Sequence, residues 1–236
     1  MFPDHSNTFA KKNMNFFRRY KIFFITMFVV SAVMVTLFYT ALTPPKDLPV
    51  YGPSMVNPEL VDSTVQHVGR THRIADFAFI NQEGKKVTHN DYRGKIYIAD
   101  FFFTTCPTIC PKMTDNMVKL QEIFRDEQRV MLLSHTVTPE IDSVPVLQAY
   151  AERKGVIPGK WHLVTGDKRD IYKIARASYL VVKTGKPEEM YDMVHTENFV
   201  LVDQERRVRG FYDGTNDEEM ERLAADVRHL LQNDKD

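Results

Sequence analysis

The apolar positions of this 236-residue chain follow two different patterns. Residues 22–42 form one apolar stretch without a charged residue. As a helix that rises about 1.5 Å per residue, this stretch is long enough to cross the roughly 30 Å hydrocarbon core of a bilayer. From residue 71 onward, short apolar runs alternate with amphipathic stretches. The pattern therefore predicts a transmembrane helix followed by one globular domain over residues 71–236.

The globular region alternates predicted strands with predicted helices. Residues 96–103 are almost continuously apolar and β-prone, as is typical of a central strand buried on both faces. Further strands are expected at 74–80, 86–88, 130–133, 162–164, 179–183, 199–202 and 208–212. Helices are expected at 111–126, 144–154, 169–177 and near the C-terminus, where Thr215 and Glu218 form a capping box. This order predicts an α/β domain of three layers.

Charge around the apolar stretch predicts its orientation. Residues 1–21 contain five basic residues and only one acidic residue, Asp4. The positive-inside rule therefore places this segment in the cytoplasm and the domain on the exported side, which in a prokaryote is the periplasmic face of the inner membrane. A cleaved signal peptide is the rival interpretation, but the stretch is long and no A-x-A-like site follows it. Residues 43–70 are rich in proline and are expected to form an extended linker.

The two cysteines of the chain, Cys106 and Cys110, directly follow the predicted central strand. Positions four apart lie on one face of a helical turn, so the two sulfurs could bind one soft metal ion or form a disulfide. The adjacent helix N-terminus favours the thiolate, which is both the nucleophile and the metal ligand. Two thiolates suit Cu(I) better than Zn(II), which ordinarily takes four ligands. Packing of both cysteines as small hydrophobic residues is the less favoured alternative.

A third metal ligand has to come from elsewhere in the chain, and position leaves two histidines open. His135 ends a predicted buried strand, so it belongs to the same edge of the sheet as the cysteines. His195 lies in the loop that leads into the strand predicted at 199–202. His162 stands beside Trp161 at the start of a strand and is expected to pack in the core. The net charge of zero, from 31 basic and 31 acidic residues, gives no indication of nucleic-acid binding.

Three motifs give the chain a resemblance to the Sco/SenC family of membrane-anchored, thioredoxin-like, copper-binding proteins. They are CPTICP at 106–111, VTPEID at 137–142 and VHT at 194–196, and the run DYRGK at 91–95 adds to the likeness. The resemblance covers about residues 71–233. It implies that Cys106, Cys110 and His195 bind one copper ion, as Cu(I) or Cu(II), and it thereby favours His195 over His135.

The resemblance also implies a function. Such proteins help to assemble the binuclear copper centre of cytochrome c oxidase and are regarded as chaperones rather than enzymes. The implied partners are the copper-receiving oxidase subunit and a copper donor or thiol reductant. One position departs from the family pattern, because Thr138 stands where the family usually has Asp. Any role of that carboxylate in metal exchange or partner contact is therefore in question here.

Two other functions are alternatives to the copper chaperone. A thiol-disulfide oxidoreductase would reduce the cysteines of a copper-receiving partner, with Cys106 and Cys110 cycling through a disulfide. The usual oxidoreductase motif has two intervening residues, whereas three separate Cys106 from Cys110. A peroxidase of the peroxiredoxin type would share the fold but would need neither the paired cysteines nor His195. The copper chaperone is the preferred hypothesis.

Overall fold

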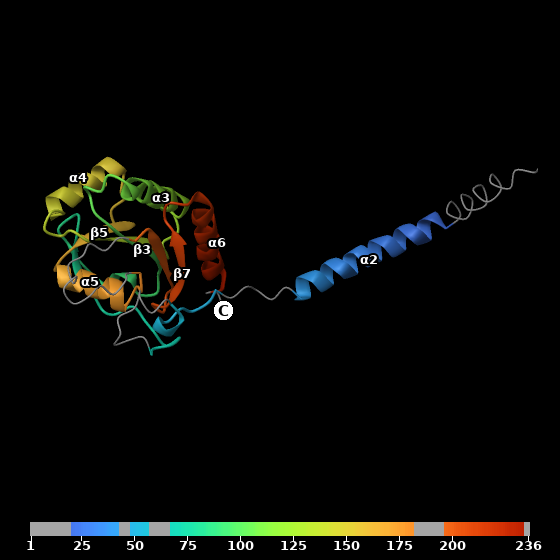
Figure 1. Ribbon diagram of the computed structural model, residues 1–236. Helices are drawn as coiled ribbons and strands as arrows, with labels where there is room; N and C mark the ends of the chain where they lie inside the picture. Colours follow the sequence, from blue (N-terminus) through green and yellow to red (C-terminus); the bar gives the residue numbers. More distant parts are fainter. Residues whose placement is uncertain (1–19, 43–47, 57–66, 182–195, 234–236) are drawn as a thin grey trace, which may run out of the picture. The chain divides into compact units, whose positions relative to one another are not determined.

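The computed structural model describes residues 20–42, 48–56, 67–181 and 196–233, which belong to two compact units, Met1–Asp47 and Leu48–Asp236. In the first unit, helix α2 covers Lys21–Leu42 and matches the apolar stretch predicted at 22–42. It is long and apolar enough to cross a membrane. The remaining elements belong to the second unit (Figure 1).

The described strands of the second unit form one seven-stranded sheet in the order β2-β1-β5-β4-β3-β6-β7. Strands β3, β4 and β5 are parallel neighbours, and the other pairs are antiparallel. The bounds are β1 Ala78–Asn81, β2 Lys86–Thr88, β3 Ile96–Phe102, β4 Val130–Thr136, β5 Trp161–Thr165, β6 Asn198–Val202 and β7 Val208–Asp213. Parallel strands place their carboxyl ends at one edge, so the loops after β3, β4 and β5 gather there.

Helices cover both faces of this sheet and complete the predicted three layers (Figure 1). Three helices pack on one face: α3 Ile109–Ile123, α4 Val144–Lys154 and α6 Asp217–Asn233. Helix α5, Lys168–Ala177, packs on the other face together with the short 3-10 helix η3, His89–Tyr92. A second 3-10 helix, η1, covers Pro53–Met55.

The burial of strand β3 on both faces explains why its sequence is apolar at nearly every position. All seven of its residues are buried. Ile96, Ile98 and Phe102 point to the core beneath α3, α4 and α6, whereas Tyr97 and Phe101 point to the core beneath α5. A strand with helices on both faces has no solvated face, so the usual alternation of apolar and polar residues is lost.

Two predictions next to helices α5 and α6 need correction. The strand expected at 179–183 is absent over its described part, Tyr179–Val181, because the chain turns sharply there. Leu180 takes a positive φ of 59°, and the Tyr179 and Val181 amides donate back to carbonyls in the last turns of α5. The cap of α6 is Asn216 instead of Thr215, since the Asn216 side-chain oxygen accepts from the Glu218 amide at 2.9 Å.

Part of the stretch expected to form an extended linker, 43–70, belongs to the second unit. Leu48 is buried in the core, and its carbonyl accepts a hydrogen bond of 2.6 Å from Arg209. Tyr51 forms an isolated β-bridge with Val208, the first residue of β7. These contacts fasten residues 48–51 to the domain, because an apolar side chain and paired backbone groups are more stable there than in water.

Candidate copper site

The cysteine loop connects the carboxyl end of β3 to the first turn of α3. Helix α3 begins at Ile109, two residues earlier than predicted, so Cys110 is its second residue and Pro111 its third. A proline is tolerated there because the first N–H groups of a helix have no partner within the helix. Cys106 lies in the loop just before the helix, and its amide donates to the Phe103 carbonyl at 3.3 Å.

Both cysteines are free thiols at the margin of the hydrophobic core. Cys106 is 9% exposed and Cys110 is 4% exposed. They belong to the same buried cluster as Phe102 of β3 and Met113 of α3. The pair is therefore nearly shielded from water, with Cys106 as the more accessible sulfur.

The two thiols have very different proton affinities. Burial alone would raise the pKa of Cys106, but hydrogen bonds from the Cys110 thiol, from Thr108 and from the Cys110 amide outweigh it and lower this pKa to about 7. The Thr108 hydroxyl lies 3.7 Å from the Cys106 sulfur. Burial and the neighbouring Cys106 sulfur raise the pKa of Cys110 to about 12. Cys106 is thus the thiol of the pair that ionises more readily, and Cys110 stabilises its thiolate form as a donor.

A buried carboxyl group lies beneath this pair on the same face of β3. Asp100 is 2% exposed, and one of its carboxyl oxygens, Oδ1, has no hydrogen-bond partner. Burial raises its pKa to about 7, an effect that the hydrogen bond with Ser134 reduces only in part. Its charge also contributes to raising the pKa of Cys110. Asp100 was not predicted as a site residue, although one acidic residue inside an apolar run of eight was a visible signal.

A second buried carboxylate holds the start of the loop. Asp142 accepts hydrogen bonds from the hydroxyls of Thr104, Thr136 and Thr138. Thr138 is the residue at which this chain departs from the Sco/SenC pattern, and its hydroxyl lies 3.0 Å from the Asp142 carboxylate. The loop after β3 and the end of β4 are therefore joined through one side chain.

His135 lies at the predicted edge of the sheet but on the face opposite the cysteines. It is fully buried and is enclosed by aromatic rings, stacking on Phe101 at 4.9 Å and meeting Phe79 edge-on at 5.5 Å. Burial lowers its pKa to about 3. Successive side chains of a strand alternate between faces, so the sheet itself separates His135 from Cys106 and Cys110.

Two histidine predictions remain to be placed. His162 is buried, as expected, and its Nδ1 lies 3.2 Å from the Tyr92 hydroxyl. His195 lies outside the described residues. Within the described part of the chain, no three His, Cys, Asp or Glu side chains converge on a point that could hold a metal ion. At the cysteine loop, the described residues thus offer the two sulfurs as candidate soft ligands.

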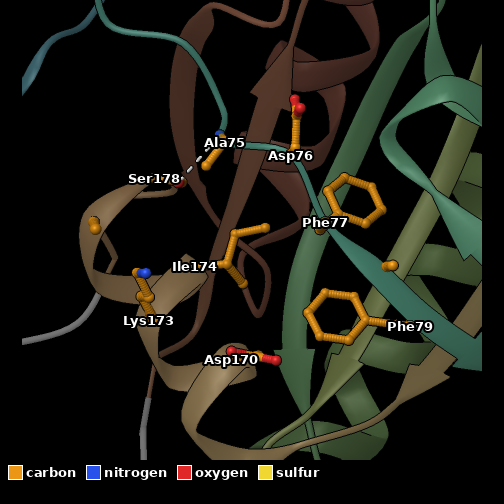
Figure 2. Close-up of a pocket in the computed structure, with 10 residues that line it drawn as sticks. Ala75, Asp76, Phe77, Phe79, Asp170, Lys173, Ile174 and Ser178 are labelled. Atoms are coloured by element: carbon orange, nitrogen blue, oxygen red, sulfur yellow. Dashed lines mark hydrogen bonds between the residues drawn. The ribbon is translucent and has the colours of Figure 1, made fainter.

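A separate hollow lies on the His135 face of the sheet, between the segment leading into β1 and helix α5. Its volume is about 280 Å³. Figure 2 shows the rings of Phe77 and Phe79 on one side and Ile174 on the other, with Asp170 and Lys173 at its margin. No residue of the cysteine loop lines it. The cysteine pair therefore lies outside this hollow.

Comparison with known proteins finds relatives of this chain by sequence. The sequence model of the SCO1/SenC family matches residues 65–232. The "SCO1 protein homolog" of Bacillus subtilis is 31% identical over 159 residues, which cover 66% of this chain and 82% of that protein.

Solved structures extend the likeness to the fold. One is the structure of BsSco, a member of the Sco family of cytochrome c oxidase assembly proteins in which a disulfide switch was identified. It is 31% identical with a TM-score of 0.58, over 67% of this chain and 93% of that one. Arabidopsis thaliana ScoI, with copper bound, is 26% identical with a TM-score of 0.52, over 65% of this chain and 97% of that one. The α/β domain thus has the thioredoxin-like fold of these proteins.

Proposed function

The chain belongs to the SCO1/SenC family, and from this premise we propose that it is a membrane-anchored copper chaperone. In this role it binds one copper ion and assists assembly of the binuclear copper centre of cytochrome c oxidase. The observation that carries the proposal is the pairing of two cysteine sulfurs in one shielded loop, one of them stabilised as a thiolate. A copper-bound relative, Arabidopsis ScoI, supports the choice of metal.

We assign the copper ligands as Cys106, Cys110 and His195. Thiolates and an imidazole form a soft donor set that suits copper in either oxidation state. His195 is chosen because it stands in the family motif VHT. The placement of His135 on the opposite face of the sheet supports this choice by removing the rival imidazole.

A reversible disulfide between Cys106 and Cys110 is the second state of the proposed site. Oxidation would use both sulfurs, so the disulfide form would lose its copper ligands and loading would follow the redox poise of the compartment. The disulfide switch named for BsSco supports this state.

A second function, reduction of the copper-receiving partner's cysteines, is favoured by the unequal pKa values of the two thiols. The Cys106 thiolate would attack the partner's disulfide and release one thiolate. Cys110 would then attack the mixed disulfide, close the Cys106–Cys110 disulfide and release the second thiolate. The two electrons pass from this chain to the partner, and two protons complete its thiols. An external thiol reductant would then restore the pair.

Helix α2 is proposed as an uncleaved anchor that keeps residues 1–21 in the cytoplasm and the domain on the periplasmic side of the inner membrane. The excess of basic residues before the helix supports this orientation. A reporter fused after Arg70 should be active only on the exported side, and the membrane-extracted protein should keep the mass of the full chain. Cytoplasmic reporter activity would reverse the orientation, and a chain starting after Leu42 would identify a cleaved signal.

The copper proposal is tested by titrating the reduced full-length chain, in detergent, with Cu(I) and Cu(II). We expect one copper per chain and sulfur coordination in X-ray absorption spectra. Cys106→Ser and Cys110→Ser should each weaken binding at least about 100-fold, since two thiolates dominate the affinity for Cu(I). His195→Ala should alter the Cu(II) spectrum, whereas His135→Ala should not. Unchanged affinity in both cysteine variants would overturn the proposal.

A further inference from the structure

Asp142 has the contacts of a residue that fixes the position of a neighbouring segment. Its side chain is fully buried, and its partners are hydroxyl and amide donors. A buried carboxylate is costly unless hydrogen bonds replace its hydration, so these donors keep it in one orientation. The donors come from two separate parts of the chain, so the fixed carboxylate holds these two parts in place relative to each other.

Thr104 supplies the contacts on the side of the cysteine loop. Its hydroxyl donates to Asp142 Oδ1 at 2.5 Å, and its amide lies 3.4 Å from Oδ1 and 3.3 Å from Oδ2. Thr104 is the second residue after β3 and precedes Cys106 by two positions. Both donors of one residue therefore fix the direction in which the loop leaves the sheet.

Thr136 and Thr138 hold the same carboxylate from the end of β4. Both hydroxyls donate to Oδ2, and the Thr138 amide in turn donates to the Thr136 hydroxyl at 3.1 Å. The Asp142 amide donates to the Thr138 carbonyl at 2.9 Å, which closes a tight turn around the carboxylate. The end of β4 thus forms a rigid base, and Thr104 is the link from this base to the cysteine loop.

We propose that Asp142 is a positioning residue for the cysteine pair, acting through Thr104 to hold Cys106 against Cys110. The same contacts suggest that Thr138 helps to orient Asp142 in this chain. At a position where the family usually carries a carboxylate, the hydroxyl serves as a donor that orients Asp142. The inference rests on the proposed copper function for one readout only, because the thiol–disulfide equilibrium of the pair reports the same positioning without metal.

The test uses the full-length chain in detergent and four single variants. Thr104→Val removes the hydroxyl on the loop side and keeps the size of the side chain. Thr136→Val removes a hydroxyl from the same carboxylate on the strand side. Asp142→Asn replaces the acceptor itself. Thr105→Val is the matched control, since Thr105 is the exposed neighbour of Thr104 in the same loop.

Each variant is equilibrated with glutathione buffers to obtain the Cys106–Cys110 thiol–disulfide constant, and its unfolding is measured separately. We expect Thr104→Val and Asp142→Asn to change the constant at least about 10-fold, which is about 30 mV for two electrons. Thr136→Val should change it less than Thr104→Val while destabilising the fold at least as much, because Thr136 is fully buried. Thr105→Val should change neither quantity.

A Thr104→Val constant equal to that of Thr105→Val would overturn the inference. So would a ranking in which the constant simply follows stability, with Thr136→Val changing it more than Thr104→Val. If Asp142→Asn fails to fold, the comparison of the threonine variants still decides. Cu(I) competition on the same samples should show at least a 10-fold weaker affinity in Thr104→Val than in Thr105→Val. Absence of copper binding by the unaltered chain would sink the proposed function and leave the glutathione result standing.

Discussion

Consecutive residues of β3 lie on opposite faces of the sheet, and the two faces differ in their chemistry. Asp100 of β3 lies beneath the cysteine pair, and its neighbour Phe101 pairs in register with His135 of β4, which points to the opposite face. Both ionisable side chains are buried, and each has one polar atom without a partner, Asp100 Oδ1 and His135 Nε2. Asp100 is in electrostatic contact with Cys110, whereas His135 is enclosed by aromatic rings.

The face of the sheet to which a side chain points thus decides whether it lies near the cysteine pair. Both residues lie near the same edge, where ligand sites of such sheets gather. Its position at this edge made His135 a candidate copper ligand, but the alternation of side chains places it on the face opposite the cysteines. We therefore expect changes on the cysteine face to alter thiol chemistry, and changes on the aromatic face to alter stability alone.

The largest expected effect is on the reactivity of the two thiols. At pH 7 about half of Cys106 should be thiolate, while Cys110 should be almost entirely protonated. We expect iodoacetamide to modify Cys106 at least about 100-fold faster, even after allowing for the weaker nucleophilicity of a thiolate with a low pKa. The rate at Cys106 should rise with pH around a midpoint near 7. Peptide mass spectrometry after partial labelling measures both sites, and equal rates would refute the assignment of Cys106 as thiolate.

His135→Ala should be the next largest change, and it should act on stability alone. Removing a ring packed among aromatic side chains leaves a cavity that should cost about 3 kcal/mol in the free energy of unfolding. Copper affinity of the folded variant should equal that of the unaltered chain. His195→Ala is the paired variant and should show a loss of Cu(II) affinity. A folded His135→Ala protein without copper binding would contradict the prediction that the aromatic face affects stability alone.

The pH dependence of stability should distinguish Asp100 from His135. Because the folded-state pKa of Asp100 is raised to about 7, the folded state retains a proton that the unfolded state has lost, so its contribution to stability falls as pH rises from about 4 to 7. For His135, with its pKa lowered to about 3, stability falls instead as pH drops below about 6.5. The two effects oppose each other between these limits.

Asp100→Asn removes the contribution of Asp100 to the pH dependence of stability and leaves that of His135. Between pH 5 and 7 the variant should gain about 2 kcal/mol relative to the unaltered chain, which follows from the shift in the pKa of Asp100. Denaturant unfolding of both proteins at the two pH values measures the change. A constant difference across this range would mean that Asp100 titrates normally in the folded protein.

Ser134→Ala should have the smallest effect and should sharpen the description of the cysteine face. Ser134 accepts a hydrogen bond of 2.8 Å from Trp161 Nε1 and also lowers the pKa of Asp100. We expect a loss of about 1 kcal/mol, a shift in the fluorescence of Trp161, the single tryptophan of the chain, and a further rise in the pKa of Asp100. Ser143→Ala is the control, because Ser143 is exposed and its side chain makes no capping bond to α4. Identical results for the two variants would contradict the contact.

Local patterns in the sequence were sufficient for the layers of the fold and for the cysteine loop. The apolar run of β3 and the helical stripe of α3 are periodic signals that need no knowledge of distant residues. The contacts of Asp142 are different, since they join residues 104 and 142 and depend on the pairing of β3 with β4. The turn at Leu180 was missed for a related reason. Its apolar residues suggest a strand, but backbone bonds to α5 impose a positive φ.

The attachment of residues 48–51 to β7 has a mechanical consequence. Val208, which pairs with Tyr51, begins β7 and lies in register with Val202 and, through it, with Tyr97 near the start of β3. The cysteines follow the other end of β3. A pull on the chain ahead of Leu48 is therefore borne first by β7 and the Arg209 hydrogen bonds, with β6 between that strand and β3. The attachment lies at the end of the sheet opposite the cysteine loop, so β7 and β6 would have to yield before tension on the chain displaced the thiols.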